Sequence, residues 1–336
     1  MTVRSASAPT FLGEGRLEPR EREYTDPGPG QLLIRVQANA VCGSDRGQYF
    51  TGSAVTPGHE AAGTVVAAGE LTGTAADTRG VVYLMDFCGE CRSCRIGATN
   101  QCLAKRADMG FSHDGGYGPW MLVHESNFFP ITDDIDIADA TMLLDVMGTS
   151  GHALTRAQAL RPDIESVYIA GAGPIGLGLA VMARLRFGSD IPVFISDVSR
   201  WRLDFAESFG VTPVLAGDTS AVGAPDVAFD SSGREVARRT ALDVLGPRGV
   251  LVCVGHGERL SLDVSSDLVA PEHGILGSEY FRFDELDENL RLLRENQHYV
   301  SRVITHRVPV DHIADAFDLF LGGETGKVVV VQEGAP

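Results

Sequence analysis

The sequence predicts an α/β fold built from a β-rich unit and a doubly wound parallel sheet. Residues 25–150 contain short stretches of alternating apolar and polar residues, such as QLLIRVQANAV at 31–41, which are typical of strands. From Ser166 onward, apolar runs (VYIAGAG, PVFISD, DVAFDSSG, GVLVCVG) alternate with helical stretches, which indicates a parallel sheet covered by helices. The tail 306–331 predicts a strand, an amphipathic helix and a final strand.

Composition limits the possible partners and the location. The chain has 336 residues, enough for two domains of about 150 residues each. A net charge of -17 argues against nucleic acid and anionic membranes as partners. There is no apolar run close to the ~20 residues of a membrane span, and the N-terminal residues lack the apolar core of a signal peptide. We therefore expect a cytoplasmic protein, in which stable disulfides are rare.

A glycine-rich turn predicts a nucleotide site. The stretch SVYIAGAGPIGLGLAVMARLRFG has G-x-G-x-x-G spacing between a predicted strand and a predicted helix that begins near residue 175. Glycines there permit a tight turn and the close approach of a pyrophosphate to the positive end of the helix. The turn residues expected to contact the cofactor are Gly171, Gly173, Pro174, Ile175 and Gly176.

An acidic residue predicts which dinucleotide is preferred. Asp197 ends the next predicted strand, at the distance from the turn where an acid binds the ribose hydroxyls of NAD and repels the 2′-phosphate of NADP. Arg200 and Arg202 follow closely and could weaken that preference. The alternative is a structural turn followed by an exposed aspartate.

Four cysteines in DFCGECRSCRIGATNQC predict a closed metal site. Their spacing, C-x2-C-x2-C-x7-C, lets four thiolates surround one tetrahedral zinc ion. A disulfide frame is disfavoured in a reducing compartment, and a redox pair requires a single C-x-x-C. With all positions filled, this zinc would be structural. Its predicted ligands are Cys88, Cys91, Cys94 and Cys102.

A second set of metal-binding residue types is more dispersed. Cys42 follows a predicted strand in VCGSD, and His59 and Glu60 lie in PGHEAAG. A lone cysteine is usually a small core residue, and a lone histidine is usually a hydrogen-bonded polar group. Four of the six cysteines belong to the closed site and Cys253 lies in a predicted strand, so Cys42 is the one left unexplained.

Taken together, these motifs resemble the zinc-dependent medium-chain dehydrogenase/reductase superfamily, the alcohol and polyol dehydrogenase group. The similarity runs nearly end to end and includes VCGSD, PGHEAAGTVVAAG, CGECRSCRIGATNQC, DGGYGPWMLV, GAGPIGLG and FDSSG. It implies a GroES-like catalytic domain formed by residues 1–150 and 285–336. It also implies a Rossmann domain inserted at residues 151–284, with the active site in the cleft.

The resemblance also implies a catalytic zinc. Its ligands would be Cys42, His59 and Asp145, with Glu60 as a fourth or exchangeable ligand. Asp145 lies in LLDVMGTSGHAL and resembles the aspartate of a bacterial subset of the family. A helix N-cap at a domain junction is the alternative for this residue.

Residues around these ligands match further family positions. Ser44 would bond the substrate oxygen and start a proton relay, while Asp45 would orient the ligand histidine. The sequence departs from many relatives at Gly47, where they carry a relay histidine, so the proton would leave by another route such as water. Other expected contacts are Thr149 and Gly255 with the cofactor, and Trp120 and His152 with the substrate pocket.

The resulting expectation is a reversible alcohol–ketone oxidoreductase that uses two zinc ions per chain and NAD, with NADP less favoured. Zinc would polarise the substrate oxygen and the nicotinamide would take the hydride. We expect a secondary alcohol on a small polyol, cyclitol or aminosugar-like molecule, and a homodimer or homotetramer as in relatives. Alternatives are an aminocyclitol dehydrogenase of a specialised biosynthetic pathway and a non-catalytic NAD-binding regulatory protein.

Overall fold

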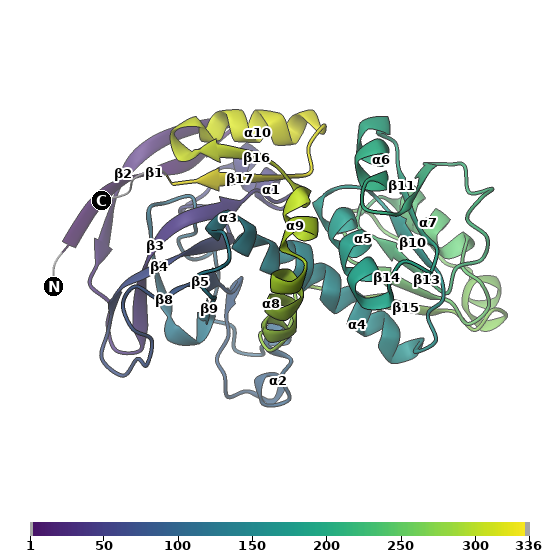
Figure 1. Ribbon diagram of the computed structural model, residues 1–336, viewed down its shortest axis with the longest axis horizontal. Coiled ribbons are helices and arrows are strands. Elements are labelled where there is room, and N and C mark those ends of the chain that lie inside the picture. The colour runs from purple at the N-terminus through teal and green to yellow at the C-terminus, as the bar shows by residue number, and fades with distance from the viewer. Residues whose placement is uncertain (1–2, 333–336) are drawn as a thin grey trace. The chain divides into compact units, whose positions relative to one another are not determined.

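The computed structural model describes residues 3–332, and the chain forms two compact units. The first runs to Leu144 and resumes at Arg282, and the second comprises Asp145–Phe281 (Figure 1). The predicted fold class, a β-rich unit together with a doubly wound parallel sheet, is confirmed.

The first unit is built on a seven-stranded sheet in the order β16-β17-β3-β4-β5-β9, with β8 paired to β3. The C-terminal strand β17 lies antiparallel to β3, with Val329 opposite Ala40, and Ala40 also faces Glu60 of β4. The end of β3 and the starts of β4 and β17 therefore lie together at the same end of the sheet. The strands are β3 (Gln31–Ala40), β4 (Glu60–Ala68), β5 (Arg79–Val82), β8 (Trp120–His124), β9 (Phe128–Pro130), β16 (Ile304–Pro309) and β17 (Lys327–Val331).

A hairpin, two short strands and several helices complete the first unit. The hairpin formed by β1 (Val3–Gly13) and β2 (Arg16–Thr25) precedes the β-rich region that the sequence predicted to begin at residue 25. The prediction missed it because each strand contains a proline and the second strand is mostly charged. The other elements are β6 (Met85–Asp86), β7 (Ala107–Asp108), α1 (Asp45–Thr51), α2 (Arg92–Arg95), α3 (Ile137–Ala140), α8 (Glu285–Glu295), α9 (Gln297–Val300) and α10 (Ile313–Gly322).

The second unit is a six-stranded parallel sheet in the order β12-β11-β10-β13-β14-β15. Its central strands β10 and β13 are buried along their whole length, as expected when helices cover both faces of a parallel sheet. The strands are β10 (Val167–Ala170), β11 (Val193–Asp197), β12 (Thr212–Leu215), β13 (Val227–Asp230), β14 (Val250–Cys253) and β15 (Gly274–Gly277). The helices are α4 (Ser150–Leu160), α5 (Pro174–Phe187), α6 (Arg200–Glu207) and α7 (Glu235–Asp243).

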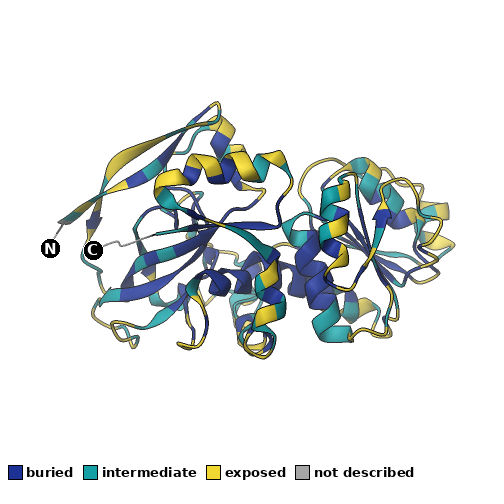
Figure 2. Cartoon of the chain, turned by 45° about the horizontal axis from the view of Figure 1, so that its top comes forward, coloured by how far each residue is buried: buried dark blue, intermediate teal, exposed yellow. Residues whose placement is uncertain are grey.

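Burial follows the sheets in both units. Figure 2 shows the strands of the two large sheets mostly buried, whereas the hairpin strand β2 is mostly exposed and the helices present exposed faces to solvent. In the first unit, aromatic rings join β1, α1 and α10: Phe317 stacks on Tyr49 at 4.7 Å and meets Phe11 edge-on at 5.1 Å. Within the described residues, no helix is long and apolar enough to cross a membrane.

Candidate metal centres and cofactor site

The four clustered cysteines lie close enough to hold one metal ion. The sulfur–sulfur distances are 3.9 Å for Cys88–Cys94, 3.5 Å for Cys91–Cys94 and 3.9 Å for Cys91–Cys102. Four sulfurs at the usual zinc–sulfur distance of about 2.3 Å would be about 3.8 Å apart in a tetrahedron. The cysteines therefore fit a closed zinc site.

Backbone N–H groups lower the pKa of two of these cysteines, Cys88 and Cys91, whereas burial raises the pKa of Cys94 to about 12. Cys91 donates its N–H to the Cys88 sulfur at 3.3 Å, and the N–H groups of Cys94 and Leu103 point to the Cys91 sulfur at 3.5 and 3.4 Å. These two donors lower the pKa of Cys91 to about 6. All six cysteines of the chain lie within the described residues 3–332, and no disulfide joins any of them there.

The second predicted ligand set also converges. Donor atoms of Cys42, His59, Glu60 and Asp145 all lie within 4.8 Å of one another. Cys42 follows β3, and His59 directly precedes β4. Gly58 sets the approach of that loop: its φ is +97°, and an added Cβ would lie 2.9 Å from the Tyr117 nitrogen.

Asp145 directly follows Leu144, the last residue of the first unit's N-terminal segment. It begins the π-helical turn Asp145–Thr149, a type of turn that is frequent at functional sites. The Thr149 hydroxyl donates to Asp145 Oδ1 at 2.9 Å. The Thr149 hydroxyl proton is therefore directed at Asp145. The expected contact of Thr149 with the nicotinamide remains a prediction.

A buried carboxylate supports the ligand histidine. Asp45 Oδ2 accepts hydrogen bonds from the Cys42 N–H at 3.0 Å and the Tyr117 hydroxyl at 2.7 Å, and Oδ1 lies 3.3 Å from His59 Nδ1. A proton on Nδ1 would face Asp45 and leave Nε2 available as a metal ligand. Burial and the nearby Asp45 raise the pKa of Tyr117 well above its usual value, so the phenol remains a hydrogen-bond donor.

Glu60 has a partner that sequence reasoning missed. Its Oε1 lies 4.0 Å from His59 Nε2, and the same oxygen accepts a hydrogen bond from Lys327 Nζ. Both side chains of this ion pair are fully buried. The signal in the sequence was a lysine at the start of an apolar strand, KVVVV, in a chain with only two lysines.

The remaining predicted pocket residues have varied surroundings. Ser44 and Gly47 are exposed, and nothing lies within 4 Å of a Cβ added at Gly47. His152 is buried in α4, and the Arg4 guanidinium lies over the Trp120 ring at 5.9 Å. The half-buried Phe111, which was not singled out from the sequence, places its ring 5.3 Å from that of His59.

The glycine-rich turn in the second unit has the predicted strand–turn–helix setting. Gly171 has a φ of +100°, and a Cβ at Gly176 would lie 1.8 Å from the Gly171 carbonyl oxygen. Only glycine fits where the turn and helix pack this closely. The helix α5 begins at Pro174, one residue before the predicted start, with Gly173 as its N-cap and Ile175 in its first turn.

A pocket opens beside this turn at the C-terminal ends of the strands. Asp197 lines it and accepts hydrogen bonds from the Ala172 and Ser199 N–H groups, both at 2.8 Å. The guanidinium of Arg202 would lie 3.6 Å from a Cβ added at Gly173, and a Cβ at Gly255 would lie 2.4 Å from the Gly233 nitrogen. Other lining residues include Tyr168, Gly171, Ser196, Val198, Ser232 and Arg234.

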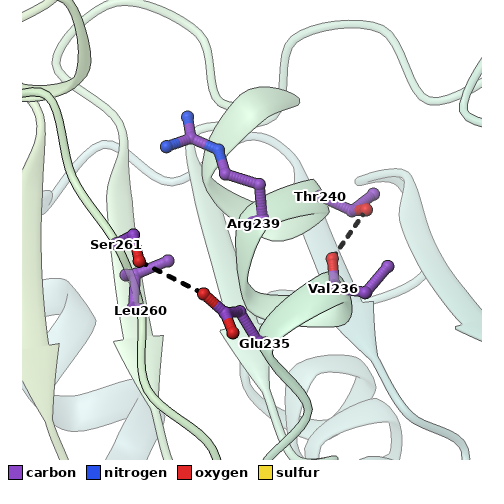
Figure 3. A pocket seen from close by; sticks show the side chains of 6 residues that line it. All are labelled: Glu235, Val236, Arg239, Thr240, Leu260 and Ser261. Atoms are coloured by element: carbon purple, nitrogen blue, oxygen red, sulfur yellow. Dashed lines mark hydrogen bonds between the residues drawn. The ribbon is translucent and has the colours of Figure 1, made fainter.

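A smaller hollow lies between α7 and residues 260–261. Figure 3 shows Glu235 in it accepting a hydrogen bond from the Ser261 hydroxyl, at 3.2 Å. Arg239 also lines it and pairs with Asp243 and Asp267. Because its charged groups are paired within the protein, this hollow is a weaker candidate for a ligand site than the pocket beside Asp197.

Comparison with known proteins agrees with both units. Residues 28–133 match the family described as Alcohol dehydrogenase GroES-like domain, and residues 174–295 match the family described as Zinc-binding dehydrogenase. An L-threonine 3-dehydrogenase of Saccharopolyspora erythraea is 30% identical over 92% of this chain and 94% of its own length. An uncharacterized zinc-type alcohol dehydrogenase-like protein of Escherichia coli is 27% identical over 95% and 96%.

A solved structure supports the same assignment. The cobalt- and zinc-bound thermostable alcohol dehydrogenase of Pyrobaculum aerophilum has a TM-score of 0.83 and 26% identity, over 98% of this chain and all of that one (100%). The chain therefore belongs to the zinc-dependent medium-chain dehydrogenase superfamily and is a zinc- and NAD(P)-dependent alcohol dehydrogenase.

Proposed function

We propose that this enzyme oxidises a secondary alcohol of a small polyhydroxylated or amino-substituted molecule, with NAD as the preferred acceptor, at a zinc held by Cys42, His59 and Asp145. The observation that carries the proposal is the convergence of these donors within 4.8 Å. A thiolate, an imidazole and a carboxylate form a three-ligand zinc set with one position open, which is the arrangement of catalytic zinc sites.

The residues around the donors have distinct tasks in this proposal. Zinc would supply Lewis acidity at the substrate oxygen, and the nicotinamide would supply the hydride acceptor. Asp45 keeps the His59 proton on Nδ1 and so presents Nε2 to the metal. Ser44, exposed ahead of α1, would take the alcohol proton, and water would carry it onward because Gly47 offers no side chain.

The cofactor preference rests on the pocket beside the glycine-rich turn. Asp197 lines it at the end of β11, where its negative charge favours ribose hydroxyls over a 2′-phosphate. Arg202 lies close to the turn and would contact the pyrophosphate. A zinc-binding dehydrogenase of Sinorhizobium meliloti solved with NADP (25% identity, 98% and 99% coverage, TM-score 0.86) makes NADP the acceptor to test against NAD.

The substrate class draws on the relatives and on the sequence. The L-threonine 3-dehydrogenases have a substrate with a secondary hydroxyl beside an amino group, which supports an amino-substituted alcohol here. An aminocyclitol of a specialised biosynthetic pathway is one member of this class. We further propose a structural zinc on the four clustered cysteines and a homodimeric or homotetrameric cytoplasmic protein.

Metal analysis and a substrate panel test the proposal. Purified protein should contain two zinc ions per chain, and polyols, cyclitols, aminosugars and threonine would be screened with NAD and NADP by the absorbance of the reduced cofactor. Cys42→Ala should retain one zinc and lose hydride transfer. Cys253→Ala is the matched control, because this half-buried cysteine belongs to neither metal group. A Cys42→Ala variant that retains both zinc ions and full turnover would refute the assignment.

A further inference from the structure

We propose that Lys327 is a positioning residue that holds Glu60 away from the catalytic zinc and so keeps one coordination position open for substrate. This inference rests on the proposed zinc site at Cys42, His59 and Asp145. It concerns a residue 267 positions from Glu60 along the chain, which approaches it only through the fold.

The contacts of one Glu60 carboxylate oxygen support this proposal. Glu60 Oε1 accepts a hydrogen bond from Lys327 Nζ and lies 4.0 Å from His59 Nε2, the nitrogen that faces the metal position. Glu60 also offers a donor atom within 4.8 Å of those of Cys42, His59 and Asp145, so its carboxylate can reach the ion. The lysine and the metal therefore compete for the same carboxylate.

The sheet fixes this competition in place. Lys327 is the first residue of β17 and Glu60 the first of β4, and both strands pair with the end of β3, which leads into Cys42. The Val41 N–H donates to the Val328 carbonyl at 2.8 Å, which anchors the lysine's neighbour beside the cysteine loop. The ammonium is thus held by strand pairing and does not depend on a mobile loop.

Charge gives the lysine its effect. A thiolate and two carboxylates, from Cys42, Asp145 and Glu60, bring three negative charges to the metal position, and zinc would offset two. The buried Asp45 behind His59 adds a further negative charge. Lys327 supplies a positive charge to this acidic site, and both members of its pair with Glu60 are fully buried. A buried carboxylate without a counter-charge is strongly unfavourable. Without the ammonium, Glu60 would pair with the metal and occupy the open position.

The test measures the open position directly in cobalt-loaded protein. Imidazole, which is neutral, should bind at that position and shift the cobalt absorption spectrum. Lys327→Met should raise the imidazole Kd by about tenfold or more, as changes behind metal ligands commonly do. Lys327→Arg retains the positive charge and should bind imidazole like the unmodified protein. Adding Glu60→Gln to Lys327→Met should restore binding, because the competing carboxylate is gone.

Either of two results would overturn the proposal: an unchanged imidazole Kd in folded Lys327→Met, or a double variant as weak as the single one. If Lys327→Met does not fold, the double variant decides, since it leaves no unpaired buried charge. Its Kd should match the unmodified protein, whereas a Kd at least about tenfold lower would mean that Glu60 already occupied the metal.

Failure of the proposed function has a different signature. Unmodified protein that takes up only one metal ion per chain would refute the zinc site itself. Unmodified protein with two ions but no imidazole shift would show that the fourth position is already filled, which refutes the role of the lysine. Unmodified protein with two ions and a normal shift, together with an unchanged Lys327→Met, would refute only the role of the lysine.

Discussion

Replacing Asp45 by Asn should weaken the catalytic zinc while leaving the fold intact. The amide oxygen can take the place of Oδ2 and still accept from the Cys42 N–H and the Tyr117 hydroxyl, at 3.0 and 2.7 Å in the native protein. The amide NH2 then faces His59 Nδ1, 3.3 Å from the native Oδ1. Two donors cannot share one hydrogen bond, so His59 would shift its proton to Nε2 and lose its metal-binding lone pair.

The expected loss follows from this single change of tautomer. Removing a carboxylate behind a ligand histidine costs between about 10-fold and about 100-fold in metal affinity. This corresponds to about 1.4 to about 2.7 kcal/mol of binding free energy. Asp45 is not a ligand of the four-cysteine site, whose zinc should be retained, so chelator treatment should leave one zinc per chain.

The assay is zinc release to a chromogenic chelator, followed by metal analysis of the retained protein. Tyr117→Phe is the matched control, because it removes a buried hydrogen bond to Asp45 but leaves the His59 partner in place. The control should lower the free energy of unfolding by about 1–3 kcal/mol and retain both zinc ions. An Asp45→Asn protein that holds its second zinc as tightly as the unmodified protein would refute the reasoning.

Three further predictions concern the cofactor and the cysteine cluster. Gly176→Ala should raise the Kd for NADH, measured by fluorescence, about tenfold, because its Cβ would displace the turn at a cost of about 1–3 kcal/mol. Gly277→Ala is the control: its added Cβ would meet nothing within 4 Å, so the Kd for NADH should not change. Asp197→Asn should raise the kcat/KM ratio of NADP over NAD about tenfold, since it removes repulsion of the 2′-phosphate, and an unchanged ratio would exclude that role. Cys94→Ser should reduce zinc to one ion per chain and lower the Tm while the other zinc stays bound; loss of both ions would show that the two sites are not independent.

Local patterns in the sequence determined the broad answers. The G-x-G-x-x-G turn between a strand and a helix, and the tight cysteine spacing, each specify a geometry within a few residues, so they predicted a nucleotide turn and a metal cluster. The strand periodicities gave the fold class, because burial on one or both faces leaves a readable pattern. Cys42 and His59 required the family resemblance, since neither motif specifies a metal alone.

Only the tertiary structure decided what surrounds those ligands. Tyr117 meets Asp45 across 72 residues of sequence, and Lys327 meets Glu60 across 267. Phe111 approaches His59 from a loop with no distinguishing motif. The Lys327–Glu60 contact arises because β17 and β4 flank the same strand, β3, in the first unit's sheet, and strand order in a sheet is set by long-range packing. Residue types indicate a candidate metal ligand. The side chains that orient this ligand and balance its charge reach it through long-range contacts that the sequence alone does not specify.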